Sequence, residues 1–436
     1  MRRRKWLGKE LRLSNLYPKQ TFFQDPRSAF YSISTLGLIS FIFLSFIYGR
    51  PAYVWLVQEN QPGIRFTDYF MHLFAAVDRH HLYQNITDAR TGCFPPLAYL
   101  MYYFLYRLTP LGLELSPRSF EEMELVPGTL QVFTYYLICS ALLLYIGISR
   151  MGQRSIRRDI TIFTLLMSSA VFAGSGYMMG NSSMLVLGLL VIAFELKESP
   201  SQWKQEAALL LFAVCVGFKL YPAVFGLIYL KEKRYKEFGR LVLYSLVLVF
   251  LPFGFFGGTE GLSAWARHIL ETMQSAQQND FGRPQYLKGM LFTVIRLMTG
   301  QELQILASVF TYMICAFWAI MAWRSKSELC TQFFLICIMV FFPVNAFRYA
   351  LSYFAIPLIA YLKRDIAWKN RPGVEWVVMV MYGLLFSIPV WWILVDGLDQ
   401  RYDIYALTSV EICLYLTAYL LIMMMTIIEL KRQKGK

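Results

Sequence analysis

Long apolar runs recur from one end of the chain to the other, and they constrain its fold more than any other feature. We place them at residues 31 to 49, 94 to 109, 129 to 149, 159 to 177, 183 to 195, 206 to 230, 241 to 256, 303 to 323, 330 to 343, 347 to 363, 374 to 396 and 408 to 429. Backbone groups inside a bilayer must pair within the protein, so these runs predict helices. We therefore expect an all-α polytopic membrane protein with about 11 to 13 transmembrane helices.

The composition agrees with this prediction. Of the 436 residues, 57% are hydrophobic and 16% are charged, whereas soluble proteins carry about 25% charged residues. The net charge of +14 would suggest a nucleic-acid partner in a soluble protein, but most Lys and Arg residues here stand beside the ends of apolar runs. A positive-inside bias explains them without nucleic acid. The seven cysteines form no Cys-x-x-Cys pair, so we expect neither a disulfide framework nor a zinc site.

Clusters of basic residues determine the predicted topology. The clusters at 231 to 240, 324 to 328 and 363 to 372, together with both termini, predict cytoplasmic segments. We expect a cytoplasmic basic N-terminus (1 to 30), a single domain embedded in the plasma (inner) membrane (31 to 429) and a cytoplasmic basic tail (430 to 436). The expected outside loops are 50 to 93, 257 to 289, 342 to 348 and 396 to 407.

The middle of the chain leaves two topologies open. The cluster at 149 to 159 is basic enough to be cytoplasmic, yet a count of twelve simple spans places it outside. Either that cluster breaks the charge rule, or 94 to 109 is a short re-entrant element and 206 to 230 is two short helices with a hinge at 219 to 222. The two topologies differ in the side of the membrane on which they place Asn181 and Lys219.

The first outside loop holds an unusual concentration of charge. At 100° per residue, a helix from Arg65 to Arg79 would place both arginines and His72 within about 60° of Asp68. Its opposite face would be apolar, with Phe66, Phe70, Leu73, Phe74 and Val77. This pattern is typical of an amphipathic helix that lies at the membrane interface. The helix could be a structural brace with solvated charges, or it could present a carboxylate whose cationic neighbours set its ionisation and bind an anionic ligand.

Several sequence elements follow one another in a characteristic order. Asp68 comes after the first span, AAVDRHHLYQN follows it, and FPPLAYLMYYFLY begins the next apolar run. Further along are GNSSMLVLGLLVIAFEL (180 to 196), GFKLYPAVF (217 to 225), PFGFFGG (252 to 258) and QYLKGMLFTVIRL (285 to 297). Over residues 64 to 363 this series resembles the polyprenol-phosphate-dependent glycosyltransferases of family 87, in the GT-C superfamily.

The sequence departs from the pattern of that family at three places. Arg348, in PVNAFRYALSYF, stands where the family often has a histidine, and Asn181 stands where it has a glutamine. Gly217 precedes Lys219 by two residues, closer than in the family's glycine and lysine element. The resemblance therefore implies glycosyl transfer in general, with mannose as one candidate sugar.

The resemblance implies a GT-C-type helical bundle that transfers a sugar, with inversion, from a polyprenyl-phosphate-linked donor to a hydroxyl of a lipid or glycan acceptor. The reaction would take place at the extracytoplasmic face, in the synthesis of cell-envelope glycolipid or polysaccharide. No Gly-rich nucleotide motif occurs between a strand and a helix, and this also favours a lipid-linked donor. A transporter or flippase of an anionic lipid-linked substrate is the rival class, and a ligase of lipid-linked glycans is a third.

Such a transfer needs a carboxylate for the acceptor proton and cations for the departing phosphate. We expect Asp68 to be the base, with Asp78 and Asp88 as weaker candidates. Donor-phosphate binding is predicted for Arg348 first, then Lys219, then Arg65 and Arg79. The predicted supporting or acceptor-side residues are His72, Asn181, Trp265, His268, Arg283 and Tyr286. No cofactor is expected; a divalent metal could bind Asp396, Asp399 and Asp403, although their spacing does not require one.

Overall fold

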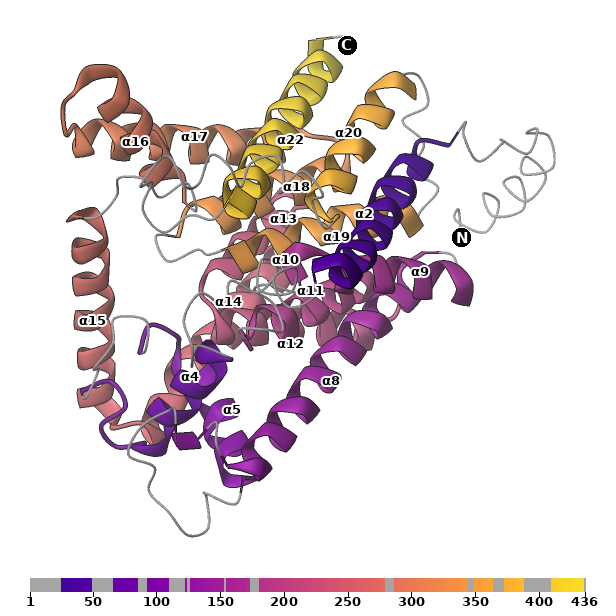
Figure 1. The fold of residues 1–436 in the computed structure, drawn as a ribbon. Coiled ribbons are helices and arrows are strands. Elements are labelled where there is room, and N and C mark those ends of the chain that lie inside the picture. The colour runs from indigo at the N-terminus through magenta and orange to yellow at the C-terminus, as the bar shows by residue number, and fades with distance from the viewer. Residues whose placement is uncertain are drawn as a thin grey trace.

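The computed structural model describes residues 25–48, 66–84, 92–109, 122–123, 126–152, 154–172, 180–278, 286–343, 348–363, 372–387 and 409–434, and these contain helices but no strand. The elements of the first half are α2 (Arg27–Tyr48), α4 (Thr67–Val77), α5 (Pro96–Arg107), α8 (Pro127–Arg150), α9 (Ile156–Met167), α10 (Ala170–Phe172), α11 (Ser183–Lys197), α12 (Gln202–Phe218), η3 (Tyr221–Phe225) and α13 (Gly226–Lys231). Those of the second half are α14 (Tyr235–Phe250), η4 (Leu251–Phe255), α15 (Gly258–Gln278), α16 (Leu287–Thr299), α17 (Gln304–Arg324), α18 (Glu328–Phe341), η5 (Arg348–Phe354), α19 (Ala355–Lys363), α20 (Pro372–Leu385) and α22 (Ser409–Lys434) (Figure 1).

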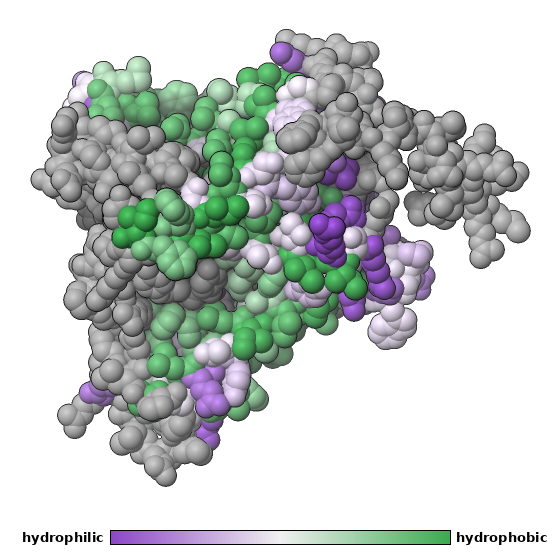
Figure 2. Space-filling view, turned by 45° about the vertical axis from the view of Figure 1, so that its right-hand side comes forward, coloured by the Kyte–Doolittle hydropathy of each residue, from purple (hydrophilic) through white to green (hydrophobic). Residues whose placement is uncertain are grey.

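Each of the twelve predicted apolar runs contains a helix, which confirms the all-α fold. Within the described residues, four segments are long and apolar enough to cross a membrane: Gly128–Arg150, Tyr235–Phe255, Gln304–Arg324 and Leu414–Gln433. Shorter apolar helical segments are Arg27–Phe43, Glu328–Phe341, Tyr349–Lys363 and Gly373–Leu385. Figure 2 shows a broad apolar band across the described surface, with hydrophilic residues gathered at its right side and lower edge. The fold is that of a polytopic membrane protein.

The segment predicted as an outside loop at 257 to 289 contains the long helix α15, which stands at the left of Figure 1. Over residues 258–272 its buried positions are Gly261, Trp265, His268 and Thr272, and their spacing follows the helical period. The other positions are largely polar, so the segment lacks the apolar run from which a spanning helix is predicted. The helix was therefore detectable only from the period of its few apolar residues.

Helix α11 lies at the centre of the bundle and packs closely against α8. A Cβ atom added at Gly188 would lie 2.9 Å from the backbone nitrogen of Leu144, and one added at Gly147 would lie 2.8 Å from the Val191 side chain. Leu144 of α8 faces Gly188 of α11, and Gly147, one turn further along α8, faces Val191, one turn further along α11. Helices α8 and α11 therefore run parallel. The missing side chains allow the close approach that is common between helices in membranes.

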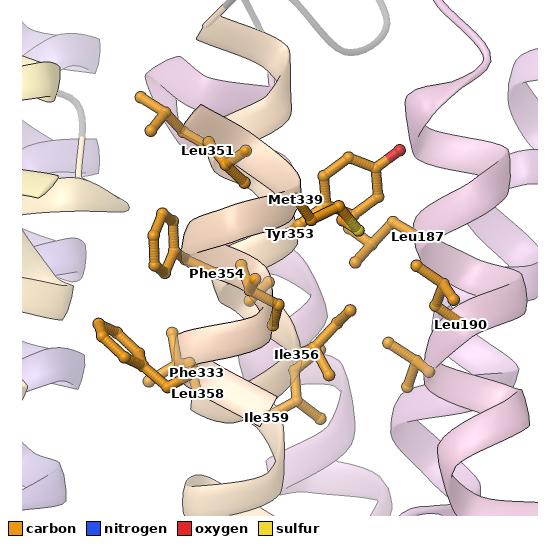
Figure 3. Close-up of a cluster of buried hydrophobic side chains, with 14 of the residues drawn as sticks. Leu187, Leu190, Phe333, Met339, Leu351, Tyr353, Phe354, Ile356, Leu358 and Ile359 are labelled. Carbon is orange, nitrogen blue, oxygen red and sulfur yellow. The ribbon is translucent and has the colours of Figure 1, made fainter. Parts of the chain in front are cut away.

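On its other side, α11 contributes to a large apolar core with α18, η5 and α19. Leu187 and Leu190 point toward Tyr353 and Ile356, and all four side chains are completely buried (Figure 3). Inside a bilayer, such fully buried side chains hold neighbouring helices together mainly by van der Waals packing. This core fixes the position of η5 relative to α11.

The predicted run at 206 to 230 is a helical hairpin, as the second of the two topologies requires. Helix α12 ends at Phe218, and η3 and α13 return along the bundle to Lys231. The ends of the two arms meet, because Arg234 donates a hydrogen bond of 3.1 Å to the Gln205 side chain. Helix α5 fits this topology as well. Its 12 residues span about 18 Å, less than the ~30 Å of a hydrocarbon core.

Basic loops that are far apart in the sequence gather at one end of the bundle. Lys197, at the end of α11, binds Glu232 at 2.5 Å, and Lys231 donates to the Ser325 carbonyl at 2.7 Å. Lys363, at the end of α19, forms a buried ion pair with Asp159 at the start of α9. Because α11 runs from Ser183 to Lys197 and α12 returns toward Lys219, the candidate residues Asn181 and Lys219 lie together at the opposite end.

Candidate active site

The helix of the first loop is shorter than predicted. It covers Thr67–Val77, whereas the sequence predicted a helix from residue 65 to residue 79. The helix stops because the Asp78 carboxylate accepts the backbone N–H of His81 at 3.2 Å and so forms a local turn. Arg79 therefore lies beyond the helix, 5.1 Å above the Phe255 ring, and the predicted polar face that it would share with Asp68 does not form. Arg65 lies outside the described residues.

Helix α4 is packed inside the protein on several sides. Tyr69, Phe70 and Leu73 are at most 1% exposed, and His72, predicted on the polar face, is 4% exposed. The amphipathic prediction was therefore wrong about the surroundings of this helix, because aromatic residues of α5 and α8 cover it. Burial raises the pKa of the Tyr69 hydroxyl above its ordinary value, so this group stays neutral and does not compete with Asp68 as an anion.

Gly180 brings the Gly-Asn element against α4. Its φ of +67° lies in the left-handed region, and a Cβ atom added there would be 2.5 Å from the Tyr69 Cβ and 2.8 Å from the Phe133 ring. Only glycine fits both the backbone conformation and the space. The close approach places Asn181, the next residue, beside the first turn of α4.

Three predicted site residues meet in one hydrogen-bonded chain. Asn181 Nδ2 donates to Asp68 Oδ2 at 2.8 Å, and Lys219 Nζ donates to Asn181 Oδ1 at 2.7 Å. Ser183 joins them, since its hydroxyl accepts from Lys219 Nζ at 2.9 Å and donates to Asn181 Oδ1 at 2.6 Å. Asp68 is partly buried, whereas Asn181 and Lys219 are each 2% exposed. The chain thus runs from a buried ammonium to a carboxylate that still reaches the surface.

Aromatic rings surround the Lys219 ammonium. Its Nζ lies 4.6 Å from the centre of the Tyr349 ring, 4.8 Å from that of Phe94 and 5.7 Å from that of Tyr221. Such cation–π contacts partly replace the hydration that a buried ammonium loses. Tyr349 directly follows Arg348, which begins η5, so the backbone at Arg348 also lies near this site. The Arg348 side chain is outside the described part of the structure.

His72 and Phe94 extend the site toward α5. The His72 ring lies 4.4 Å from the Phe94 ring, and His72 Nδ1 is 3.2 Å from the Tyr99 hydroxyl. That hydroxyl accepts the Gly92 backbone N–H at 2.6 Å, which ties the segment before Phe94-Pro95 to α5. His72 is therefore held beside the ring that also contacts Lys219, about one helical turn from Asp68.

The remaining candidates occupy other positions. Trp265 packs 5.5 Å from the Phe253 ring of η4, and His268 Nε2 lies 3.5 Å from the Thr272 hydroxyl one turn along α15. Tyr286 is 1% exposed and precedes α16. Arg283, Asp88, Asp396, Asp399 and Asp403 fall outside the described residues. Among the residues that the structure describes, no group of three or more His, Cys, Asp or Glu side chains could hold a metal ion.

Sequence reasoning missed Ser183, Phe94 and Tyr349 as site residues. Their signals were weak: Ser183 stands two residues after Asn181, Phe94 begins the Phe-Pro-Pro motif, and Tyr349 follows the candidate Arg348. Each is a common residue type near a helix end, and only the folded arrangement brings it to Lys219 or Asn181.

Comparison with known proteins identifies the family of the chain. No curated protein and no solved structure matches the chain. The family model described as glycosyltransferase family 87 matches residues 95–347, which is more than half of the chain. The matched range includes Asn181, Ser183 and Lys219 of the hydrogen-bonded chain. This membrane protein therefore belongs to glycosyltransferase family 87.

Proposed function

We propose that the protein transfers a sugar, with mannose as one candidate, from a polyprenyl-phosphate-linked donor to a hydroxyl of a lipid or glycan acceptor. The acceptor oxygen attacks the anomeric carbon as the bond from that carbon to the phosphate oxygen breaks, so the anomeric configuration inverts. Asp68 takes the proton of the acceptor hydroxyl. The electron pair of the broken bond leaves with the polyprenyl phosphate, and Arg348 is proposed to bind this anion through its guanidinium group.

The observation that carries the proposal is the position of the Asp68 carboxylate. It is partly buried and bonded by Asn181, at the end of a chain that begins with a cation. Hydrogen bonds from charged or polarised donors favour the ionised form of a carboxylate. A general base needs that form, together with access to the acceptor hydroxyl.

The distribution of charge supports an extracytoplasmic location of the site. The loops around Lys197, Lys231 and Lys363 share one end of the bundle, and Asp68, Asn181 and Lys219 lie toward the other. Cytoplasmic loops carry the excess of Lys and Arg in membrane proteins. The basic end is therefore proposed to be cytoplasmic, in the plasma (inner) membrane, and to contain the N- and C-termini.

The test is transfer of labelled sugar by the purified protein from a panel of polyprenyl-phosphate sugars to extracted membrane lipids and glycans. We expect transfer by the natural protein, a loss of about 10²–10⁴-fold in kcat for Asp68→Asn, and near-normal transfer for the exposed Asp78→Asn. Equal rates for Asp68→Asn and the natural protein would refute the base. Movement of labelled lipid across liposomes, without transfer from any donor in the panel, would instead support a flippase.

A further inference from the structure

We propose that Lys219 and Asn181 are positioning residues that act on the reaction through Asp68. In this arrangement Lys219 fixes the amide of Asn181, and the amide holds the Asp68 carboxylate in the orientation of the base. The inference deepens the proposed function and rests on the role of Asp68 in it. It also replaces the prediction that Lys219 binds the donor phosphate.

The orientation of the Asn181 amide follows from its partners. One of its terminal atoms is approached by three donors: Lys219 Nζ at 2.7 Å, the Ser183 hydroxyl at 2.6 Å and the Ser183 backbone N–H at 3.0 Å. An amide NH₂ group cannot accept hydrogen bonds, so this atom is the oxygen. The nitrogen must then face Asp68, to which it donates at 2.8 Å. Rotation of the amide by 180° would lose these bonds.

The surroundings of Lys219 leave its ammonium little freedom to bind a phosphate. The group has three N–H donors, and two of them are engaged by Asn181 Oδ1 and Ser183 Oγ. The rings of Phe94, Tyr221 and Tyr349 surround the same nitrogen, and the residue is 2% exposed. A donor phosphate could reach it only if this packing opened. The ammonium is thus directed toward Asn181.

The backbone explains why a lysine can point into this position from the middle of an apolar run. Lys219 caps α12 with extended backbone angles, φ −151° and ψ 126°, and Pro222 lies in the first turn of η3. A proline restricts helical continuation through the residues that precede it. The chain therefore reverses at Lys219, and its side chain projects from the tip of the hairpin toward the start of α11.

The positive charge of Lys219 polarises the hydrogen-bonded chain to Asp68, which a neutral residue would not do. An ammonium at the amide oxygen draws electron density toward that oxygen, which makes the amide nitrogen a stronger donor to the carboxylate. In a buried site this effect is screened less than in water. Loss of Lys219 should therefore weaken the hold on ionised Asp68 even though Lys219 does not touch it.

The main test is Lys219→Met, made alone and together with Asp68→Asn. Methionine is chosen because it keeps the length of the lysine stem and its packing against Phe94 and Tyr349. For Lys219→Met we expect a loss of about 10²-fold in kcat, the scale of a small misplacement of a reacting group, with an unchanged KM for the donor. We also expect the acid limb of the kcat profile to move to higher pH, because ionised Asp68 is less stabilised. Tyr102 and Tyr349 also interact electrostatically with Asp68. Both tyrosines are unchanged in every variant, so a shift of the profile reports the substitution of Lys219.

The double variant separates positioning from phosphate binding. If Lys219 acts through Asp68, then Lys219→Met should cause no further loss once Asp68→Asn is present. A further loss of the same fold in the double variant, or a raised donor KM with unchanged kcat in Lys219→Met, would overturn the inference and return Lys219 to the phosphate. Lys219→Gln, which keeps a donor toward Asn181 but removes the charge, should restore part of kcat while its pH profile stays shifted.

Two measurements keep this test distinct from that of the proposed function. Lys231→Met is the matched control, because Lys231 also donates hydrogen bonds through its ammonium, three in its case, but lies at the other end of the hairpin. It should lower Tm without a shift of the pH profile. In the absence of any sugar donor, the Tm losses of Lys219→Met and Asp68→Asn should be non-additive. Additive losses would refute the coupling between Lys219 and Asp68. If the natural protein transfers no sugar, the proposed polyprenyl-phosphate sugar donor is refuted. The coupling measured by Tm then still tests the inference about Lys219 and Asn181.

Discussion

Substitution of Gly180 by alanine should damage both the stability and the activity of the protein. Gly180 has φ +67°, and an added Cβ would lie 2.5 Å from the Tyr69 Cβ, a distance at which one of the two segments has to move. The left-handed backbone costs an alanine about 1–2 kcal/mol. The overpacking against Tyr69 and Phe133 adds about 1–3 kcal/mol. The expected total is about 2–5 kcal/mol, a large share of the 5–15 kcal/mol by which folded proteins are typically stable.

Two other glycines separate these contributions. Gly300 has a similar φ of +69° but no atom within 4 Å of an added Cβ, so Gly300→Ala should cost only the backbone part, about 1–2 kcal/mol. Gly239, inside α14, also has open space around an added Cβ and a helical backbone. Gly239→Ala should therefore stabilise the protein by about 0.5–1 kcal/mol.

The assay is thermal unfolding of the three variants in one detergent at one scan rate, because unfolding of such proteins is often irreversible. The expected order of Tm is Gly239→Ala at or above the natural protein, then Gly300→Ala, then Gly180→Ala. Sugar transfer should fall only for Gly180→Ala, by up to about 10²-fold, because a displaced Asn181 no longer holds the base. A Tm for Gly180→Ala equal to that of Gly300→Ala would refute the close packing of Gly180 against α4.

Further predictions concern other contacts. Lys363→Met should cost about 3–5 kcal/mol, because it leaves Asp159 as an unpaired buried charge, and Tm should largely recover when Asp159→Leu is added. Gly188→Val should destabilise the α8 and α11 pair by about 1–3 kcal/mol, visible as a lower Tm than that of Gly239→Ala. A cysteine at exposed Gln84 should react with a membrane-impermeant thiol reagent added outside cells, and one at exposed Lys236 only after lysis; the reverse pattern would invert the proposed topology.

The sequence was sufficient to predict the fold class because spanning helices require long apolar runs. It was not sufficient for α15, whose single buried stripe includes Trp265 and His268, since an amphipathic helix leaves no such run. The hairpin at 206 to 230 could be predicted as one of two alternatives, because Lys219 and Pro222 interrupt the apolar run. The charge pattern alone could not decide between the hairpin and a single span. The meeting of Arg234 with Gln205 shows that the chain reverses there.

The site was predicted residue by residue, but its arrangement was not. Asp68, Asn181 and Lys219 were each named as candidates, yet 113 and 38 residues separate the bonded pairs, and no local pattern reports such contacts. The predicted partnership of Asp68 with Arg79 failed for a local reason. The Asp78 side chain competes for backbone hydrogen bonds and ends the helix, and helical periodicity does not include that competition.

The aromatic enclosure of Lys219 has a consequence for the synthesis of the protein. Phe94 and Tyr221 are made before or with the hairpin, but Tyr349 and Tyr353, which meet Lys219 and Tyr221, come much later. Tyr221 and Tyr353 are 132 residues apart, so at about 5–20 residues per second the ribosome needs roughly 7–26 s to supply the second partner. During that interval the lysine at the hairpin tip lacks one wall of its enclosure. The active end is thus completed only when η5 docks, and a nascent chain that stops before it holds an uncovered charge.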